Sequence, residues 1–276
     1  MNNYDDIKGF LLKPYAERQL IVVLSDEQIK KKEKEQKRRN TPINSILKFG
    51  LSTFTVSVGV PYVELVEALY KSIKELREKG VNTVPVSQTL SNNLKFPIGH
   101  PRFKVLYVAH PAKSDVYYPF AQFHRFTFEH KFSEAITLLM SLGASYIEVE
   151  HVTGWSKEFS TRLGISIPAA MTNLESEVSS NTKKDSQLLF TANLDPKLEA
   201  ALPENLVWYH HEPTWQQIAD GRLKYGLKDF SLSVRYEDDL GVNTSLKQAA
   251  TNAGLDISGR FEDHESTVWR IAGRFE

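Results

Sequence analysis

The chain of 276 residues contains no cysteine, and its 34 basic side chains balance 34 acidic ones. The absence of cysteine excludes disulfide bonds, thiolate metal sites and cysteine nucleophiles. The balanced charge excludes the overall basic excess that is typical of proteins binding duplex nucleic acid. The sequence has neither a basic, apolar secretory signal at its start nor an apolar run of about 18 residues. We therefore expect a cytoplasmic protein without a transmembrane segment.

Apolar patterns predict two strands and two helices before residue 81. The aliphatic run at 20–24 predicts a buried strand, and the spacing of Ser25 and Gln28 predicts a capped helix behind it. Residues 52–60 alternate apolar and polar side chains, which predicts a strand with one buried face. Residues 61–80 carry apolar side chains at helical spacing, which predicts an amphipathic helix.

The middle of the chain is predicted to form a loop, two strands and a helix. Residues 87–101 are rich in asparagine, proline and glycine, which are typical of loops. The apolar run at 103–111 predicts a strand that ends near His110. A helix that ends at 142–143 is expected next, followed by a strand over 145–152.

The composition changes at 172–186, which is polar and rich in serine. Such a segment is typical of a long loop or an interlobe linker. We therefore predict an N-terminal α/β lobe over 1–171 and a C-terminal α/β lobe over 187–276. The packing of both as one domain is the alternative.

The C-terminal lobe is predicted to alternate strands with short helices. The predicted strands are 188–194, 206–211 and 229–237, and the predicted helices are 214–226 and 245–254. The segment 255–275 is predicted to form a terminal hairpin. Hairpins require antiparallel pairing, whereas strand–helix–strand units permit parallel pairing. We therefore predict an α+β fold with a mixed, largely antiparallel β-sheet flanked by helices; the alternative is a doubly wound α/β sheet.

The sequence contains no motif of a nucleotide-binding loop, a nucleophile elbow or a metalloprotease helix. Ionisable residues do lie on or just after several predicted strands, and the candidate catalytic residues are His110, Glu150, His210, His211 and Glu212. Parallel neighbouring strands would bring these side chains together beyond their carboxyl ends. Imidazole and carboxylate groups in that position support acid–base catalysis or metal binding. The competing interpretation is ordinary polar turns, and the sequence identifies no particular cofactor or metal.

A basic segment is the candidate for anion binding, and its side chains are Lys30, Lys31, Lys32, Lys34, Lys37, Arg38 and Arg39. Such a patch attracts the phosphate groups of nucleic acid or of anionic lipid. No aromatic residue interrupts the segment, which disfavours a base-stacking platform. A solvated helix of mixed charge is the competing interpretation.

Three functions are consistent with these observations. The first is a cytosolic, non-catalytic interaction or ligand-sensing protein, which recognises a protein partner or a second copy of itself. The second is a hydrolase or lyase that uses the histidine and carboxylate residues at the strand ends. The third is a protein that binds an anionic lipid or nucleic acid through residues 30–39.

Overall fold

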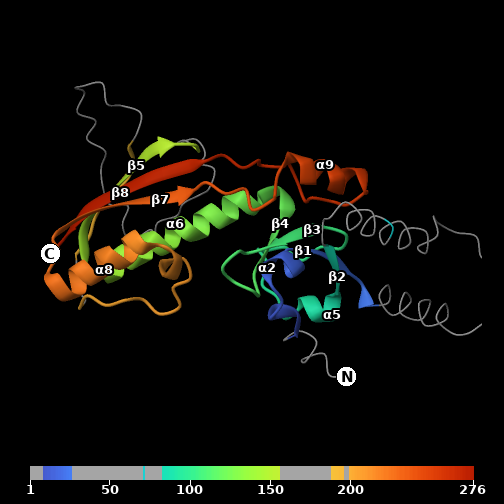
Figure 1. The fold of residues 1–276 in the computed structure, drawn as a ribbon, viewed down its shortest axis with the longest axis horizontal. Coiled ribbons are helices and arrows are strands. Elements are labelled where there is room, and N and C mark those ends of the chain that lie inside the picture. Colours follow the sequence, from blue (N-terminus) through green and yellow to red (C-terminus); the bar gives the residue numbers. More distant parts are fainter. Residues whose placement is uncertain (1–8, 27–70, 72–82, 156–187, 196–198) are drawn as a thin grey trace, which may run out of the picture. The chain divides into compact units, whose positions relative to one another are not determined.

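The computed structural model describes residues 9–26, 71, 83–155, 188–195 and 199–276 (Figure 1). Several predicted features lie outside these described residues: the basic segment 30–39, the strand 52–60 and the polar segment 172–186. The predicted helix 61–80 also lies outside them except for Lys71, which is helical.

The described residues form an α+β fold with two four-stranded, mostly antiparallel sheets, which confirms the fold class expected from the sequence. Among the described strands, one pair alone is parallel, so the alternative of a doubly wound parallel sheet is wrong. No helix in this part of the chain is long and apolar enough to cross a membrane.

The chain divides into two compact units. The first unit contains residues 1–123 and 242–261, and the second contains residues 124–241 and 262–276. Each unit is therefore built from two separate stretches of sequence. These bounds differ from the predicted division at 172–186, which lies outside the described residues.

The sheet of the first unit has the strand order β2-β1-β3-β4. Its strands are β1 (Leu20–Leu24), β2 (Thr83–Ser87), β3 (Leu106–Ala109) and β4 (Tyr117–Pro119). β1 pairs in parallel with β2 and antiparallel with β3. All five residues of β1 are buried, as their uniformly aliphatic character predicts.

The described part of the first unit also contains short helices: α2 (Tyr15–Arg18), α5 (Gln88–Ser91), η2 (Phe120–Gln122) and α9 (Thr244–Asn252). α9 matches the helix predicted over 245–254. The side chain of Asn243 caps it and accepts a hydrogen bond of 3.1 Å from the backbone N–H of Leu246. The return segment 242–261 also continues the fold of this unit, because the N–H of Leu106 donates to the carbonyl of Asp256 at 2.8 Å.

The sheet of the second unit has the order β6-β5-β8-β7, and all its pairs are antiparallel. Its strands are β5 (Ala144–Thr153), β6 (Leu188–Asn193), β7 (Asp229–Tyr236) and β8 (Thr267–Phe275). The predicted terminal hairpin over 255–275 is wrong, because β8 pairs with β5 and β7 rather than with the residues just before it. Buried and more exposed side chains alternate along β7, so one side of the strand faces the core.

The helices among the described residues of the second unit are α6 (Phe123–Ser141), η4 (Tyr209–His211) and α8 (Pro213–Tyr225), and α6 runs along the sheet in Figure 1. Buried apolar residues of α6 recur at helical spacing and join one core with the strands: Phe128, Phe132, Ala135 and Leu139. α8 matches its predicted bounds and ends at Gly226, whose φ of 66° is left-handed. The strand predicted over 206–211 is wrong, since η4 forms there instead.

Candidate functional site

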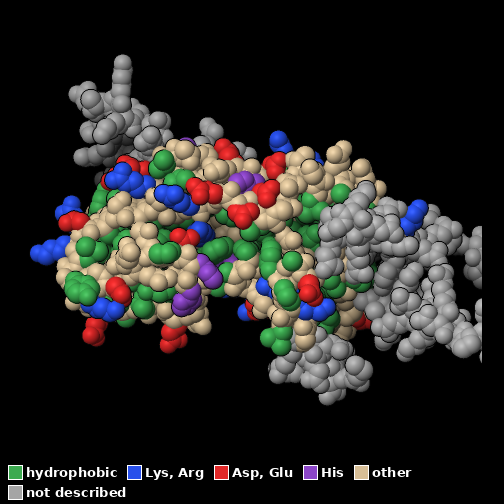
Figure 2. All heavy atoms as spheres, viewed as in Figure 1, with side chains coloured by type: hydrophobic (Ala, Val, Ile, Leu, Met, Phe, Trp, Pro, Cys, Tyr) green, Lys and Arg blue, Asp and Glu red, His purple; other side chains and the backbone are tan. Residues whose placement is uncertain are grey.

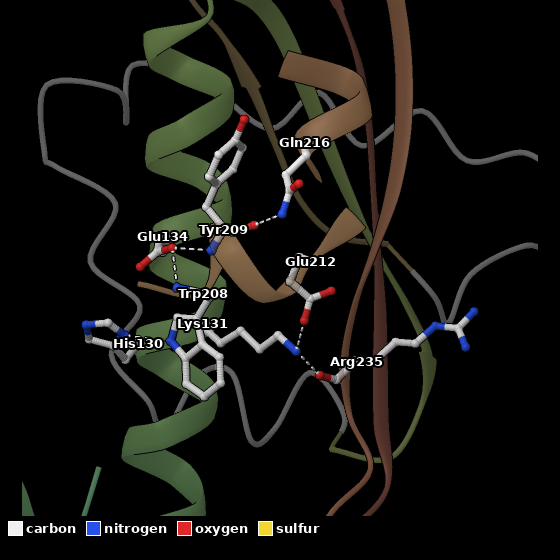
Figure 3. Close-up of polar contacts among 8 residues, drawn as sticks. All are labelled: His130, Lys131, Glu134, Trp208, Tyr209, Glu212, Gln216 and Arg235. Atoms are coloured by element: carbon white, nitrogen blue, oxygen red, sulfur yellow. Dashed lines mark hydrogen bonds and ion pairs between the residues drawn. The ribbon is translucent and has the colours of Figure 1, made fainter. Parts of the chain in front are cut away.

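The predicted residue Glu212 lies in the second unit, where α6 meets η4 and the start of α8 (Figure 3). Its carboxylate binds the ammonium group of Lys131 on α6. The same ammonium donates a hydrogen bond of 2.8 Å to the carbonyl of Arg235 on β7 and lies 5.3 Å from the ring centre of Trp208. Lys131 therefore ties a helix, a strand and the start of α8 to one another through a single, mostly buried charge.

A second acidic side chain, Glu134 on α6, holds the segment that contains η4 (Figure 3). The buried carboxylate of Glu134 accepts hydrogen bonds from three consecutive backbone N–H groups. The distances are 2.9 Å from Val207, 2.7 Å from Trp208 and 2.9 Å from Tyr209. The amino end of a helix carries unpaired N–H groups and partial positive charge, which a carboxylate satisfies. Glu134 therefore explains why these residues form a helical turn rather than a strand.

Two neutral hydrogen bonds extend this arrangement (Figure 3). The indole N–H of Trp208 donates to Nδ1 of His130 at 2.8 Å, which leaves the proton of a neutral imidazole on Nε2. The side-chain amide of Gln216 donates to the carbonyl of Tyr209 at 2.8 Å. The segment before α8 is therefore held by side chains from α6 and from α8.

The predicted residues His210 and His211 lie on η4, beside Glu212, and both are exposed. Among the described residues, no group of three histidine or acidic side chains has the geometry of a metal site. The ring nitrogens of these two imidazoles can donate and accept hydrogen bonds beside the carboxylate of Glu212. Their catalytic role stays a prediction, and so does that of Glu212.

The other two predicted catalytic residues lie elsewhere. Glu150 is on β5 of the second unit and pairs with Arg270 on β8 at 3.6 Å. His110 belongs to the first unit and follows β3, where its Nδ1 accepts hydrogen bonds of 3.0 Å from the N–H groups of Ala112 and Lys113. A shared site of the predicted catalytic residues required that their strands be parallel neighbours. β3, which precedes His110, and β5, which contains Glu150, belong to different sheets.

The predicted anion-binding residues of segment 30–39 lie outside the described residues. On the face shown in Figure 2, the basic and acidic side chains of the described residues are mixed in small groups. No patch of one sign dominates that view of the described residues.

The structure brings together a histidine cluster that sequence reasoning missed. In the second unit, Nδ1 of the buried His124 lies 2.8 Å from the hydroxyl of Tyr236. The ring of His264 lies 5.4 Å from that of His124 and 5.3 Å from that of Tyr236, between ring centres. The three residues come from distant stretches of sequence, so no local motif signals the cluster.

Two acidic side chains contact Arg125 on the first turn of α6, next in sequence to His124. Glu262 binds Nε of Arg125 at 3.1 Å, and Glu129 lies 3.7 Å from the same guanidinium. The pKa of Glu129 is raised to about 7, mainly by burial. The guanidinium of Arg125 acts to lower this pKa, and the carboxylate of Glu262 acts to raise it. A carboxyl group with this pKa exchanges its proton near neutral pH.

A loop of the first unit, residues 97–104, exposes large apolar side chains. Ile98 is fully exposed and Phe103 is 52% exposed, although the backbone of the loop is bonded to the buried Tyr107. The hydroxyl of the buried Tyr107 accepts a hydrogen bond of 2.6 Å from the N–H of Arg102 and lies 2.7 Å from Nδ1 of His100. The composition of residues 87–101 predicts a loop, which is wrong over Gln88–Ser91, where α5 forms, and it does not indicate this anchor.

No protein-family model, no curated protein and no solved structure matches the chain.

Proposed function

We propose that the protein is a non-catalytic interaction protein and that loop 97–104 is its recognition element. The observation that carries this proposal is the full exposure of Ile98 on a loop whose backbone is fixed by a buried tyrosine. Connecting loops that expose apolar side chains usually move freely, whereas a fixed loop offers them in one arrangement. Binding and recognition residues concentrate on loops held by a rigid scaffold.

Several bonds fix the loop. The Nε of Arg102 donates to the carbonyl of Gly99 at 3.2 Å, and the N–H of Lys104 donates to the carbonyl of Val23 on β1 at 3.1 Å. Gly99 and Lys104 both have left-handed φ angles, of 82° and 63°. Lys104 holds this conformation without being a glycine, which costs energy that the surrounding bonds offset.

This rigidity favours tight association. Burying a large apolar side chain contributes roughly 1.5–3 kcal/mol, and the loop presents Ile98 and Phe103 for burial. A segment already held in its bound shape loses little conformational entropy on binding. The exposed Arg102 lies between the two, and arginine and aromatic residues are common among the side chains that dominate binding energy.

The composition of the loop indicates the chemistry of the partner. Ile98 and Phe103 require an apolar pocket, and the guanidinium of Arg102 requires a carboxylate at the rim of that pocket. We therefore propose a protein partner with an apolar pocket bordered by an acidic side chain.

A crosslinking experiment tests this proposal. Phe103 is replaced by a photoreactive phenylalanine analogue in the full chain, and an extract of the source cells is titrated against it under illumination. We expect one saturable adduct with a second protein, and its loss when Ile98→Asp is added. The matched control carries the same analogue at Tyr225 of the second unit, which is 83% exposed.

The outcomes are distinct. An adduct of twice the chain mass would identify self-association in place of a different partner. Equal or unsaturable labelling from positions 103 and 225 would contradict the proposal. Since both positions are exposed, neither variant removes core packing, and circular dichroism verifies that each is folded.

Two further functions remain proposals. The exposed imidazoles of His210 and His211 beside Glu212 favour hydrolase or lyase activity as the second candidate. Binding of anionic lipid or nucleic acid through residues 30–39 rests on the sequence of that segment. The cytoplasmic location expected from the sequence belongs to the same set of proposals.

A further inference from the structure

The hydroxyl group of Tyr107 has one proton to donate and two lone pairs to accept with. The N–H of Arg102 occupies one lone pair at 2.6 Å. Tyr107 is buried, so water does not serve its proton. In the described part of the chain, Nδ1 of His100, at 2.7 Å, is the one acceptor for that proton. This assigns the hydrogen bond: the hydroxyl of Tyr107 donates to Nδ1 of a neutral His100, whose own proton lies on Nε2.

The groups around His100 come from three parts of the first unit. Tyr107 contributes from β3 with its ring edge-on at 5.5 Å between ring centres, Arg102 contributes from the loop, and Asp256 contributes from the segment after α9. Burial lowers the pKa of His100, the guanidinium of Arg102 lowers it further, and Asp256 opposes them. Burial also raises the pKa of Tyr107, so its hydroxyl keeps its proton.

Protonation of His100 would remove the acceptor. Nδ1 would then carry a proton of its own, and the buried hydroxyl of Tyr107 would have nowhere to donate. The new positive charge would also face Arg102. Both effects act on the residues that fix the backbone of the loop.

We infer that loop 97–104 is a pH-responsive recognition element, held in its binding shape while His100 is neutral and released when His100 gains a proton. This inference rests on the proposed function, because it describes the regulation of the same loop. Binding through Ile98 and Phe103 is therefore expected to weaken as the pH falls. The partner is released in an acidic environment and retained at neutral pH.

The chain offers a test that needs no partner. Because it has no cysteine, Ile98→Cys provides a single attachment point for a nitroxide spin label. Electron paramagnetic resonance then follows the mobility of the label from a pH of about 8 to about 5, the range in which histidine titrates. Nuclear magnetic resonance of His100 in the same samples reports its protonation.

We expect the label at position 98 to shift from a slow to a fast component as His100 becomes protonated. In the His100→Asn background, the side-chain oxygen of asparagine accepts from Tyr107 but does not titrate, so we expect no shift. A label at Val152→Cys, on the second unit and 48% exposed, is the control for general unfolding.

Four results would overturn the inference. These are an unchanged label while His100 titrates, a His100 that stays neutral throughout, an equal shift in the His100→Asn background, and a parallel shift at position 152. None of these results depends on a partner. A failure here is therefore distinguishable from a failure of the crosslinking experiment, which tests whether the loop binds anything.

Discussion

The ammonium group of Lys131 binds the carboxylate of Glu212, and their side chains are 10% and 22% exposed. Each charge has lost most of its water and depends on the other for compensation. The carbonyl of Arg235 contributes one further hydrogen bond but no charge. The pair joins α6 to the start of α8, so its loss should affect the whole second unit.

Lys131→Met should lower the free energy of unfolding by about 2–4 kcal/mol, because Glu212 would remain partly buried without its cation. The double variant Lys131→Met with Glu212→Leu should recover most of this loss. Urea denaturation followed by tryptophan fluorescence measures both. Lys224→Met is the matched control, since Lys224 and its partner Asp220 are 60% and 54% exposed, and it should leave the stability nearly unchanged. Equal losses in the two lysine variants would contradict the prediction.

Glu134→Gln should destabilise the segment before α8. The amide oxygen that remains can accept some of the three N–H bonds but carries no charge, so we expect a loss of about 2–3 kcal/mol. Hydrogen exchange at the amides of Val207, Trp208 and Tyr209 should accelerate more than elsewhere. Asp238→Asn is the control, because that exposed carboxylate accepts one N–H bond among the described residues, from Leu240 at 2.7 Å. Unchanged exchange at 207–209 would show that Glu134 does not hold this turn.

Stability should depend on pH through Glu129. Its pKa is raised in the folded state to about 7 from an ordinary value of 4.5, first by burial. A raised pKa means that the folded state holds the proton of Glu129 more tightly than the unfolded state does. The stability that this proton contributes is complete below the ordinary pKa of 4.5 and is lost as the pH rises through about 7. Glu129→Gln should therefore be more stable than the natural protein above pH 7. Below pH 7 its free energy of unfolding should change less with pH than that of the natural protein.

Chemical denaturation at a series of pH values measures this profile. The control is Glu265→Gln, which changes an exposed carboxylate on the same unit. A profile of Glu129→Gln that runs parallel to that of the natural protein would refute the assignment.

Two buried tryptophans of the second unit should respond differently to the same substitution. Trp269 donates its indole N–H to the carbonyl of Trp155 at 3.0 Å, whereas that of Trp215 has no acceptor among the described residues. Trp269→Phe should therefore cost about 1–2 kcal/mol more than Trp215→Phe, because only the first change removes an indole hydrogen bond that the described residues make. Both residues are fully buried, so the lost volume is similar. Thermal and urea denaturation of the two variants provide the comparison.

Local patterns in the sequence were sufficient for several elements. The aliphatic run of β1 is buried on every residue, and α8 (Pro213–Tyr225) lies within one residue of the helix predicted over 214–226. The alternating side chains of β7 also gave its position. In each case the interactions that form the element join residues close in sequence, or they depend only on how much of the element is buried.

Elements that depend on distant partners could not be predicted in the same way. Residues 206–211 have the apolar content of a strand, but the carboxylate of Glu134, more than 70 residues earlier, stabilises a helical turn. The cluster of His124, Tyr236 and His264 depends on the start of α6, the end of β7 and the segment before β8, which meet only in the folded unit. The anchor of loop 97–104 includes the hydroxyl of Tyr107, and the apolar run at 103–111 gave no indication of its contacts with His100 and Arg102.

The position of β8 has a consequence for the order in which the second unit forms. β8 follows β5 and β7 along the chain, yet it lies between them in the sheet. A nascent or truncated chain that reaches only residue 266 would carry two strands whose inner edges have no hydrogen-bonding partner. Such edges readily pair with other chains. Emerging polypeptides of this protein would therefore need shielding, by a chaperone or by rapid completion, until the final interior strand is inserted.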